Sequence, residues 1–352
     1  MKILITGIGG FAASSIAKTL LQSHSNFKII GLDNFSRKGS EQNISRLIDM
    51  GVKLIRADIR AQSDIDALPQ VDWVIDCAAN PSVLAGLDGQ SSSRQLLENN
   101  LLGTINLLEY CKRHKAGLIL LSTSRVYSAS ELAALPVKSS GDRFALKNCD
   151  FSGALSLGIS EDFPTTAPLS LYGASKLASE TLILEYGECF EFPVWINRCG
   201  VLAGAGQFGK ADQGIFSFWI HSFRENKPLK YIGFNGTGHQ VRDALHPQDL
   251  VALLSRQMLE PKCEAPKIIN LGGGLENSLS LKELSSWCED RFGANLVVPS
   301  KEKRLLDAPW IVMDSSTAQS AWNWRPEIRI NQILEEIASF ADSNPKWLSF
   351  TS

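Results

Sequence analysis

The sequence has no excess of charge of one sign and no long apolar run. It contains 35 Lys and Arg against 37 Asp and Glu, for a formal charge of -2. Composition therefore gives no electrostatic reason to expect nucleic acid or an anionic membrane as a partner. A transmembrane helix needs roughly 18 or more consecutive apolar residues, and no such run occurs. The opening MKILITGIGGF reaches glycines after four apolar positions, too soon for a signal peptide.

Cysteine and histidine are sparse and scattered. The seven cysteines are odd in number and include no CxxC pair, so we expect neither a disulfide framework nor a structural zinc site. A reducing, cytoplasmic location fits this usage best. The five histidines show no metal-ligand spacing, so we predict no metal. The cysteines are Cys77, Cys111, Cys149, Cys189, Cys199, Cys263 and Cys288.

Short apolar runs alternate with helical patterns through the first two hundred residues. Helical patterns occur at 12–23, 94–113 and 175–190. Buried strands that alternate with helices predict an α/β fold in which a doubly wound parallel sheet is covered on both faces. The apolar runs are KILIT, FKIIGL, VKLIRA, VDWVIDCA, GLILLS and PVWINR.

The pattern changes after about residue 198. Glycine-rich turns there are followed by helical patterns at 247–259, 280–292 and 331–340. We predict a first domain over 1–198 and a smaller α/β domain over 199–352, and a segment at about 238–262 could return to the first. The stretch from Ser128 to Pro168 is long for a loop. We interpret it as a lid or an insertion beside the active site.

A glycine-rich turn joins the first predicted strand to the first predicted helix. Gly7, Gly10 and Ala13 have the spacing G-x-x-G-x-x-A. Glycine lets the backbone approach a pyrophosphate, and the helix N-terminus supplies unpaired N–H groups. Asp33 ends the second strand, twenty residues beyond Ala13, where a carboxylate can bind the ribose hydroxyls of adenosine.

Charged residues after the second and third strands bear on how a dinucleotide would bind. The negative charge of Asp33 favours NAD over NADP. Arg37 and Lys38 follow it and could receive a 2′-phosphate, yet we predict NAD. Asp58 follows the third strand and is either a contact of the adenine edge or a cap of its own strand.

Hydroxyl groups and a tyrosine–lysine pair are expected at one edge of this sheet. Thr123 follows the GLILLS strand at its carboxyl end, where ligands bind in such folds. In SLYGASK, Tyr172 and Lys176 would share one helix face, although such a pair can also be just the start of a helix. A tyrosine shuttles protons near neutral pH only if its pKa falls about 3 units from 10. We expect the Lys176 ammonium and an oxidised nicotinamide to lower it.

The chain resembles the extended short-chain dehydrogenase/reductase superfamily over nearly its whole length. The motifs that carry the resemblance are, in this order, the glycine turn, Asp33, Asn100 in NNLLGTINLLE, Thr123 and YGASK. The resemblance implies a Rossmann-type NAD-binding domain over 1–198 and catalytic roles for Thr123, Tyr172 and Lys176. The residues that it places at the NAD site are Gly7, Gly9, Gly10, Phe11, Asp33, Asn34, Asp58, Ile59, Ala78, Asn100, Tyr172 and Lys176.

Other stretches narrow the resemblance. Four of them are similar to the CDP-paratose (CDP-tyvelose) 2-epimerase group of nucleotide-sugar epimerases. They are LDNFSRKGSEQN, GQFGKADQGIFSFW, NGTGHQVRDALHPQDL and NLGGGLENSLSLKEL. This implies NAD-dependent epimerisation through a transient keto sugar, with a CDP-sugar as the preferred guess and 199–352 as the sugar-binding domain. Arginines suit phosphate oxygens, although each could be only a surface ion pair. The implied substrate contacts are Asn80, Ser124, Gln207, Arg242, Arg304 and Asp307.

Other activities stay open at this stage. A UDP-glucose 4-epimerase or a 4-keto reductase would use the same trio of residues. A 4,6-dehydratase needs an acidic pair just after the threonine, where this chain has Ser124 and Arg125, unless an acid from 128–168 substitutes. A non-catalytic NAD-binding regulator is a third alternative. Related enzymes pair two long helices per subunit, which here implies a homodimer or a tetramer through 94–113 and 175–190.

Overall fold

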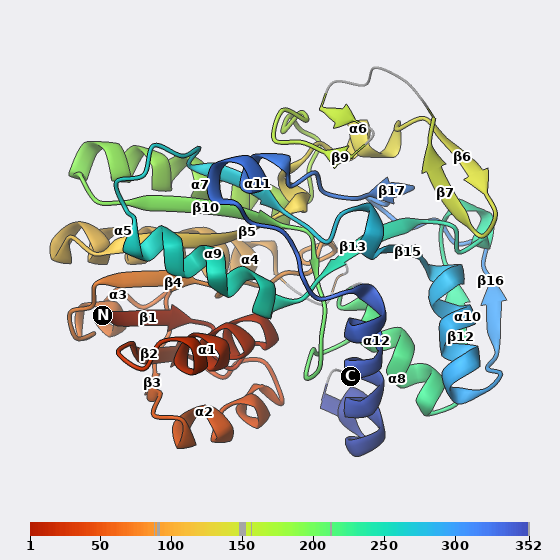
Figure 1. Ribbon diagram of the computed structural model, residues 1–352, viewed down its shortest axis with the longest axis horizontal. Coiled ribbons are helices and arrows are strands. Elements are labelled where there is room, and N and C mark those ends of the chain that lie inside the picture. Colours follow the sequence, from red (N-terminus) through yellow and green to blue (C-terminus); the bar gives the residue numbers. More distant parts are fainter. Residues whose placement is uncertain (88, 90–91, 148–152, 156, 212, 351–352) are drawn as a thin grey trace.

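The centre of the computed structural model is a parallel sheet of seven strands in the order β14-β10-β5-β4-β1-β2-β3 (Figure 1). The structure describes residues 1–350 except 88, 90–91, 148–152, 156 and 212. Six of the seven strands coincide with the predicted apolar runs, and the predicted fold class is confirmed. The strands are β1 (Lys2–Thr6), β2 (Lys28–Asp33), β3 (Lys53–Arg56), β4 (Trp73–Asp76), β5 (Gly117–Thr123), β10 (Val194–Cys199) and β14 (Ile268–Leu271).

Helices cover both faces of this sheet because its strands are apolar on both sides. Ile3 and Ile5 point into one apolar cluster with α1 and α9, whereas Leu4 points into the other cluster with α5 and α7. This alternation follows the two-residue period of a strand. The helices of the two layers are α1 (Phe11–Ser23), α2 (Ser45–Asp49), α3 (Gln62–Asp66), α4 (Ser93–Leu97), α5 (Gly103–His114), α7 (Leu171–Phe190), α9 (Pro247–Leu259) and α11 (Ser316–Trp322).

A smaller portion, on the right of Figure 1, is built around β13. β13 pairs with three short strands, and β12 pairs separately with β16. Three helices pack over a third apolar cluster. The elements are β11 (Val201–Leu202), β12 (Leu229–Tyr231), β13 (Val241–Leu245), β15 (Ser278–Ser280), β16 (Val297–Pro299), β17 (Trp310–Ile311), α8 (Ile215–Arg224), α10 (Leu281–Phe292) and α12 (Ile330–Ser343).

The chain passes between the two portions more than once after residue 198. Within the predicted returning segment 238–262, α9 packs on α1 of the large sheet, while β13 belongs to the smaller sheet. β14 then completes the large sheet, which the sequence pattern did not predict. Its four residues, IINL, are too few to show a period. The domain boundary at 198 stays a prediction.

The long segment 128–168 contains α6 (Ala129–Ala133) and two hairpins, β6 (Val137–Ser140) with β7 (Arg143–Leu146) and β8 (Ala154–Leu155) with β9 (Gly158–Ile159). It packs on both portions: the Arg143 guanidinium donates to Ser278 Oγ (2.6 Å) in the smaller portion, and the Asn270 amide of β14 donates to the Glu161 carboxylate (2.7 Å). None of its described residues lines the cleft discussed below. For these residues, the hypothesis of a lid is wrong.

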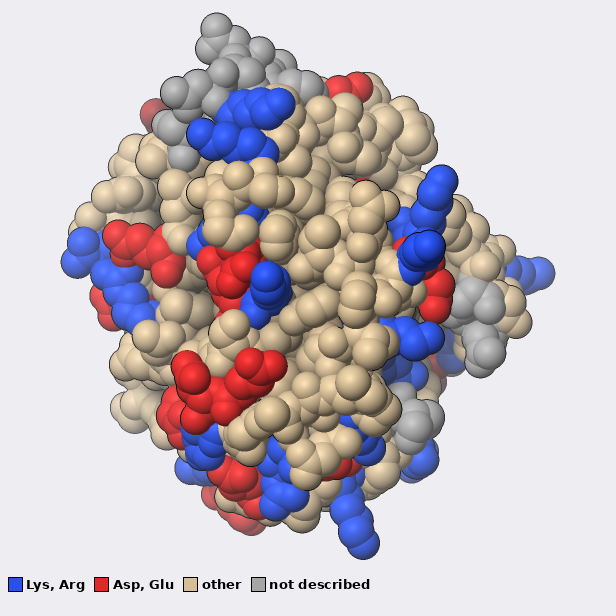
Figure 2. All heavy atoms as spheres, turned by 90° about the vertical axis from the view of Figure 1, so that its right-hand side faces the viewer, with Lys and Arg blue, Asp and Glu red and all other residues tan. Residues whose placement is uncertain are grey.

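Several compositional expectations can be compared with the described residues. No helix among them has the length and apolarity that crossing a bilayer requires, and they contain no group of three or more potential metal ligands. Their six cysteines are free thiols; Cys149 lies outside the described residues. Figure 2 shows acidic and basic side chains next to one another in small groups on the face of the smaller portion.

Candidate active site

A cleft of about 1280 Å³ lies at the carboxyl end of the large sheet. The strand order reverses between β1 and β4, and this is where ligands bind in open α/β sheets. Residues from both portions of the chain line it. The predicted site residues along its wall are Gly7, Gly10, Phe11, Asp33, Asn34, Ile59, Ala78, Asn80, Thr123, Ser124, Tyr172, Lys176, Gln207 and Arg304.

The glycine turn after β1 is shaped for a close ligand. Gly7 has a φ of +65°, and a Cβ there would stand 3.0 Å from the Ala78 Cα. The Gly10 amide donates to the Gly7 carbonyl (2.8 Å), which closes the turn. No side chain caps the N-terminus of α1 at Gly10, so the first amides of this helix are available to an anion. These features fit the pyrophosphate of a dinucleotide.

The Asp33 carboxylate ties this turn to the loop after β2. Its Oδ2 accepts from the Gly9 amide (2.9 Å), and its Oδ1 accepts from the Phe35 amide (2.8 Å). The basic pair that follows also lines the cleft, but both side chains already contact other groups. The Arg37 guanidinium lies 4.9 Å from the centre of the Phe208 ring, and Lys38 donates to the Ser349 carbonyl. This arrangement fits NAD better than NADP.

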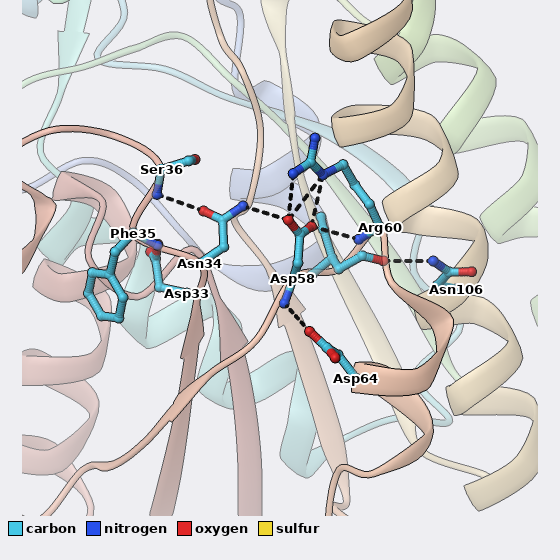
Figure 3. A network of polar contacts seen from close by, with 9 residues as sticks. Asp33, Asn34, Phe35, Ser36, Asp58, Arg60, Asp64 and Asn106 are labelled. Atoms are coloured by element: carbon cyan, nitrogen blue, oxygen red, sulfur yellow. Dashed lines mark hydrogen bonds and ion pairs between the residues drawn. The ribbon is translucent and has the colours of Figure 1, made fainter.

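Asp58 is held within its own turn and does not line the cleft (Figure 3). The Arg60 guanidinium lies 2.6 Å from its Oδ2, and Asn34 Nδ2 donates to the same oxygen (3.0 Å). The hydrogen bonds from Arg60 lower the pKa of Asp58 to about 2. The geometry therefore supports the cap interpretation, while the neighbouring Ile59 is the residue that reaches the cleft.

Asn100 is buried in a π-helical turn (Glu98–Leu102) between α4 and α5. Its Oδ1 accepts from the Asn80 amide (2.8 Å), and its Nδ2 donates to the Asn80 carbonyl and to Ser175 Oγ (3.1 Å each). It therefore joins the cleft loop at Asn80 to helix α7 at Ser175. Asn100 does not line the cleft, so the geometry supports a structural role for it rather than the direct NAD contact that the resemblance implies.

Thr123, Tyr172 and Lys176 meet in the cleft. Thr123 ends β5, Tyr172 lies in the first turn of α7, and Lys176 follows one turn later. The Thr123 side chain is close enough to Tyr172 to lower the pKa of its phenol. Lys176 is only 2% exposed. The structure thus brings together the three residues that the sequence predicted as catalytic.

The pKa of Tyr172 differs from the expectation. Burial raises it to about 12, while the Thr123 side chain and the charge of Arg125 lower it in part. The Lys176 ammonium is close enough to Cys199 to offset part of the rise that burial imposes on the pKa of that thiol. The expected lowering of the Tyr172 pKa is therefore absent in the protein by itself, because burial outweighs the surrounding charges.

A buried ion pair behind the trio was not predicted. Glu180 lies one turn beyond Lys176 on α7, and its Oε2 is 2.7 Å from Arg198 Nη2; their side chains are 2% and 6% exposed. Ser122 Oγ donates to Glu180, and Arg198 also donates to Tyr127 Oη. The spacing Lys176-x-x-x-Glu180 could have placed Glu180 on the same helix face as Tyr172 and Lys176 from the sequence alone. This network joins α7 to the ends of β5 and β10.

The predicted substrate contacts fall into two groups. Gln207 and Arg304 line the cleft with Asn80 and Ser124. Gln207 Oε1 is buried and has no hydrogen-bond partner among the described residues. Because it is an acceptor, it fits a hydroxyl or amino group better than a phosphate.

Arg242 and Asp307 do not line the cleft. Arg242 Nη2 lies 3.0 Å from Asp307 Oδ1, and the two side chains are 13% and 8% exposed. The pair is thus a largely buried ion pair. Other residues on the cleft wall were given no binding role from the sequence. Arg125 was considered only because it stands where a 4,6-dehydratase has one of its two acids. These residues include Arg125, Phe208, Lys210, Lys303 and Phe350.

Comparison with known proteins decides the family. A family described as "NAD dependent epimerase/dehydratase family" matches residues 3–272. The chain belongs to this family. The predicted superfamily and the predicted cofactor, NAD, are confirmed. The glycine turn and the uncapped start of α1 are compatible with this cofactor.

Individual relatives carry different activities in their names. The chain is 27% identical to the CDP-paratose 2-epimerase of Salmonella typhi, over 97% of this chain and 100% of that one. It is 28% identical to the dTDP-D-glucose 4,6-dehydratase of Dictyostelium discoideum, over 79% and 59%. The UDP-glucuronic acid 4-epimerase of Bacillus cereus, solved with UDP-glucuronic acid and NAD, superposes with a TM-score of 0.78 at 27% identity, over 97% and 99%.

Proposed function

We propose that this protein is an NAD-dependent nucleotide-sugar epimerase that acts through a transient keto sugar, with an activity like that of CDP-paratose 2-epimerase. The observation that carries the proposal is that Thr123, Tyr172 and Lys176 meet on the wall of a cleft that the glycine turn also lines. The full-length similarity to the Salmonella enzyme supports the finer assignment. The substrate proposed first is a CDP-linked deoxyhexose, with inversion at C2.

The chain's own part in this reaction is to move one proton. NAD, when bound, supplies the reversible redox chemistry at the sugar carbon. Tyr172 Oη takes the proton of the sugar hydroxyl and later returns it, while Thr123 holds the same hydroxyl through its own side chain. Lys176 provides a buried positive charge that favours the phenolate. Because burial raises the pKa of Tyr172 to about 12, this base needs further positive charge at the site to act at neutral pH.

Water elimination fits the site less well than epimerisation. A dehydratase needs an acid to protonate the leaving hydroxyl. The two positions after Thr123 are Ser124 and Arg125, and both line the cleft. Among the described residues of 128–168, no carboxylate reaches it; Asp150 lies outside the described residues. The proposal therefore favours an epimerase over the dehydratase also found among the relatives.

The decisive experiment is a substrate panel. The purified protein is denatured to identify any released cofactor, and the native protein is incubated with CDP-, UDP-, GDP- and dTDP-sugars while NMR follows the products. We expect bound NAD and inversion of one stereocentre without net change in NAD. Loss of water would identify a dehydratase, and stoichiometric consumption of NADH would identify a reductase. Absence of turnover on every sugar would point to a regulator and overturn the proposal.

We also propose a homodimer formed through the helices of one sheet face. α5 and α7 pack side by side over the same apolar cluster. Leu97 at the end of α4 and Leu102 in the π-helical turn are each 39% exposed. Such leucines on long neighbouring helices suit a self-complementary interface.

A further inference from the structure

Three guanidinium groups lie near one another at one side of the cleft: Arg125 and Arg304 are on its wall, and Arg242 lies behind them. The charged groups that act on Arg125 are Arg242, Arg304 and Asp307, together with the ionisable Tyr172. Asp307 is already bound to Arg242 through its Oδ1. Arg125 itself lies two residues beyond Thr123 and lines the cleft. Asp243 also acts on Arg242, so the three arginines and the two carboxylates together carry a net charge of about one positive unit.

The Arg125 side chain has few partners for its size. A guanidinium has five N–H donors, yet within the described part of the chain the only hydrogen bond of the Arg125 guanidinium runs from Nη1 to the Leu306 carbonyl at 3.4 Å. Burial, with smaller contributions from Arg242 and Arg304, lowers the pKa of Arg125 to about 10, although Asp307 offsets part of this change. Like charges are thus held together without enough counter-charge, an arrangement typical of a site for an anion.

Because its side chain reaches from the catalytic turn to the loop 304–307, we propose that Arg125 binds the substrate's diphosphate at the phosphate attached to the sugar. This inference rests on the proposed function. In a nucleoside diphosphate sugar, that phosphate is joined directly to the sugar ring. An arginine that acts on both Tyr172 and Arg304 stands where such a phosphate must lie if the sugar is at Tyr172. The diphosphate also balances the excess positive charge, and a guanidinium can bind it in a bidentate manner.

The proposed role of Arg125 goes beyond holding a phosphate, because Arg125 lies next to the catalytic turn in the chain. Arg125 belongs to the same turn as Thr123 and Ser124, and the Arg125 amide donates to Thr123 Oγ1 (3.2 Å). A phosphate held by its side chain is therefore fixed relative to the residue that holds the reacting hydroxyl. Arg125 becomes a residue that sets how far the reacting carbon lies from the phosphate.

The test compares nucleoside diphosphates with monophosphates. Calorimetry measures the affinities of UDP, UMP, CDP and CMP for the NAD-containing protein, for Arg125→Gln and Arg125→Lys, and for the matched control Arg291→Gln. Arg291 pairs with Glu335 and Asp342 on the surface, outside the cleft. We expect Arg125→Gln to weaken the diphosphates on the order of tenfold to a hundredfold and the monophosphates by less than about threefold. Arg125→Lys should recover part of the loss, and Arg291→Gln should equal the native protein.

The outcomes separate the two proposals. If the native protein prefers diphosphates and Arg125→Gln keeps the same preference while unfolding at the native temperature, Arg125 does not bind the phosphate and the epimerase proposal stands. If Arg125→Gln weakens monophosphates and diphosphates equally, its effect is structural and the inference fails. If the native protein binds none of the four nucleotides, the inference and the proposed nucleotide-sugar substrate fail together.

Discussion

The backbone of Arg125 lies directly against Gly173 of helix α7. A Cβ on residue 173 would stand 2.0 Å from the Arg125 carbonyl oxygen, far inside any van der Waals contact. Ser170 caps the helix by accepting from the Gly173 amide (2.9 Å). The turn after β5 and the first turn of α7 thus touch through their main chains. This contact lets Tyr172 reach Thr123.

Gly173→Ala should separate these two segments. The methyl group has backbone on its far side, so the helix must shift, which costs about 1–3 kcal/mol of stability. A displacement of about 1 Å at a reacting group can cost on the order of a hundredfold in rate. Urea unfolding and the turnover number of the sugar identified in the panel measure the two effects.

The control for this variant lies on the same helix. A Cβ on Gly187 would approach the Val194 side chain at 2.8 Å, so Gly187→Ala should also be destabilised but should keep its turnover. Native turnover in Gly173→Ala would show that the close contact is unrelated to catalysis.

Tyr172→Phe removes only the hydroxyl that is proposed as the base. We expect turnover to fall by about 10²–10⁴-fold, with NAD content unchanged, because the phenyl ring still fills its position. NMR of the sugar products and absorbance of the released cofactor give the two readouts. A variant that keeps turnover would exclude Tyr172 as the proton carrier.

Asp243 should make the protein less stable as pH rises. It is fully buried in β13, and burial raises its pKa from 3.8 to about 6. Its Oδ1 has no partner among the described residues. Between about pH 4 and pH 6 the folded state holds a proton that the unfolded state releases. The contribution of Asp243 to the free energy of unfolding is therefore fully present below pH 4 and is lost as pH rises through 6. Its size is on the order of 3 kcal/mol.

Unfolding by urea at pH 4.5 and pH 7.5 tests this expectation. The difference in unfolding free energy between the native protein and Asp243→Asn should change between these pH values, because the amide does not titrate. If the two proteins show the same pH dependence, Asp243 is not the group responsible.

Leu97→Glu combined with Leu102→Glu should produce monomers. The charges would be buried without partners in the proposed helix interface. Light scattering after gel filtration gives the mass, and Leu296→Glu is the control because Leu296 is 62% exposed in the smaller portion. A native protein that is already monomeric would contradict the proposed dimer.

Much of the fold and of the site could be predicted from local patterns. The six apolar runs became strands because their residues are apolar on both faces. The glycine turn, Asp33 and the pair Tyr172 and Lys176 are defined by spacings of a few residues. Parallel strands share one carboxyl edge, so Thr123 could be placed near Tyr172 without coordinates.

Contacts between distant segments were decided by tertiary structure alone. β14 adds to β10 across about seventy residues of chain, and no local pattern marks this pairing. Arg242 could be named from the sequence, but only the fold shows that it is paired with Asp307. The packing of 128–168 on the smaller portion likewise depends on partners more than one hundred residues away.

The sequence by itself determined six strands of the sheet, the glycine turn and the side chains proposed as reactive, because these depend on residue type and short spacing. Only the tertiary structure decided the electrostatics of the site. Burial, and not the expected lysine, dominates the pKa of Tyr172, and Arg125 meets two other arginines. Desolvation and long-range charge depend on what the fold places around a group, which no stretch of sequence contains.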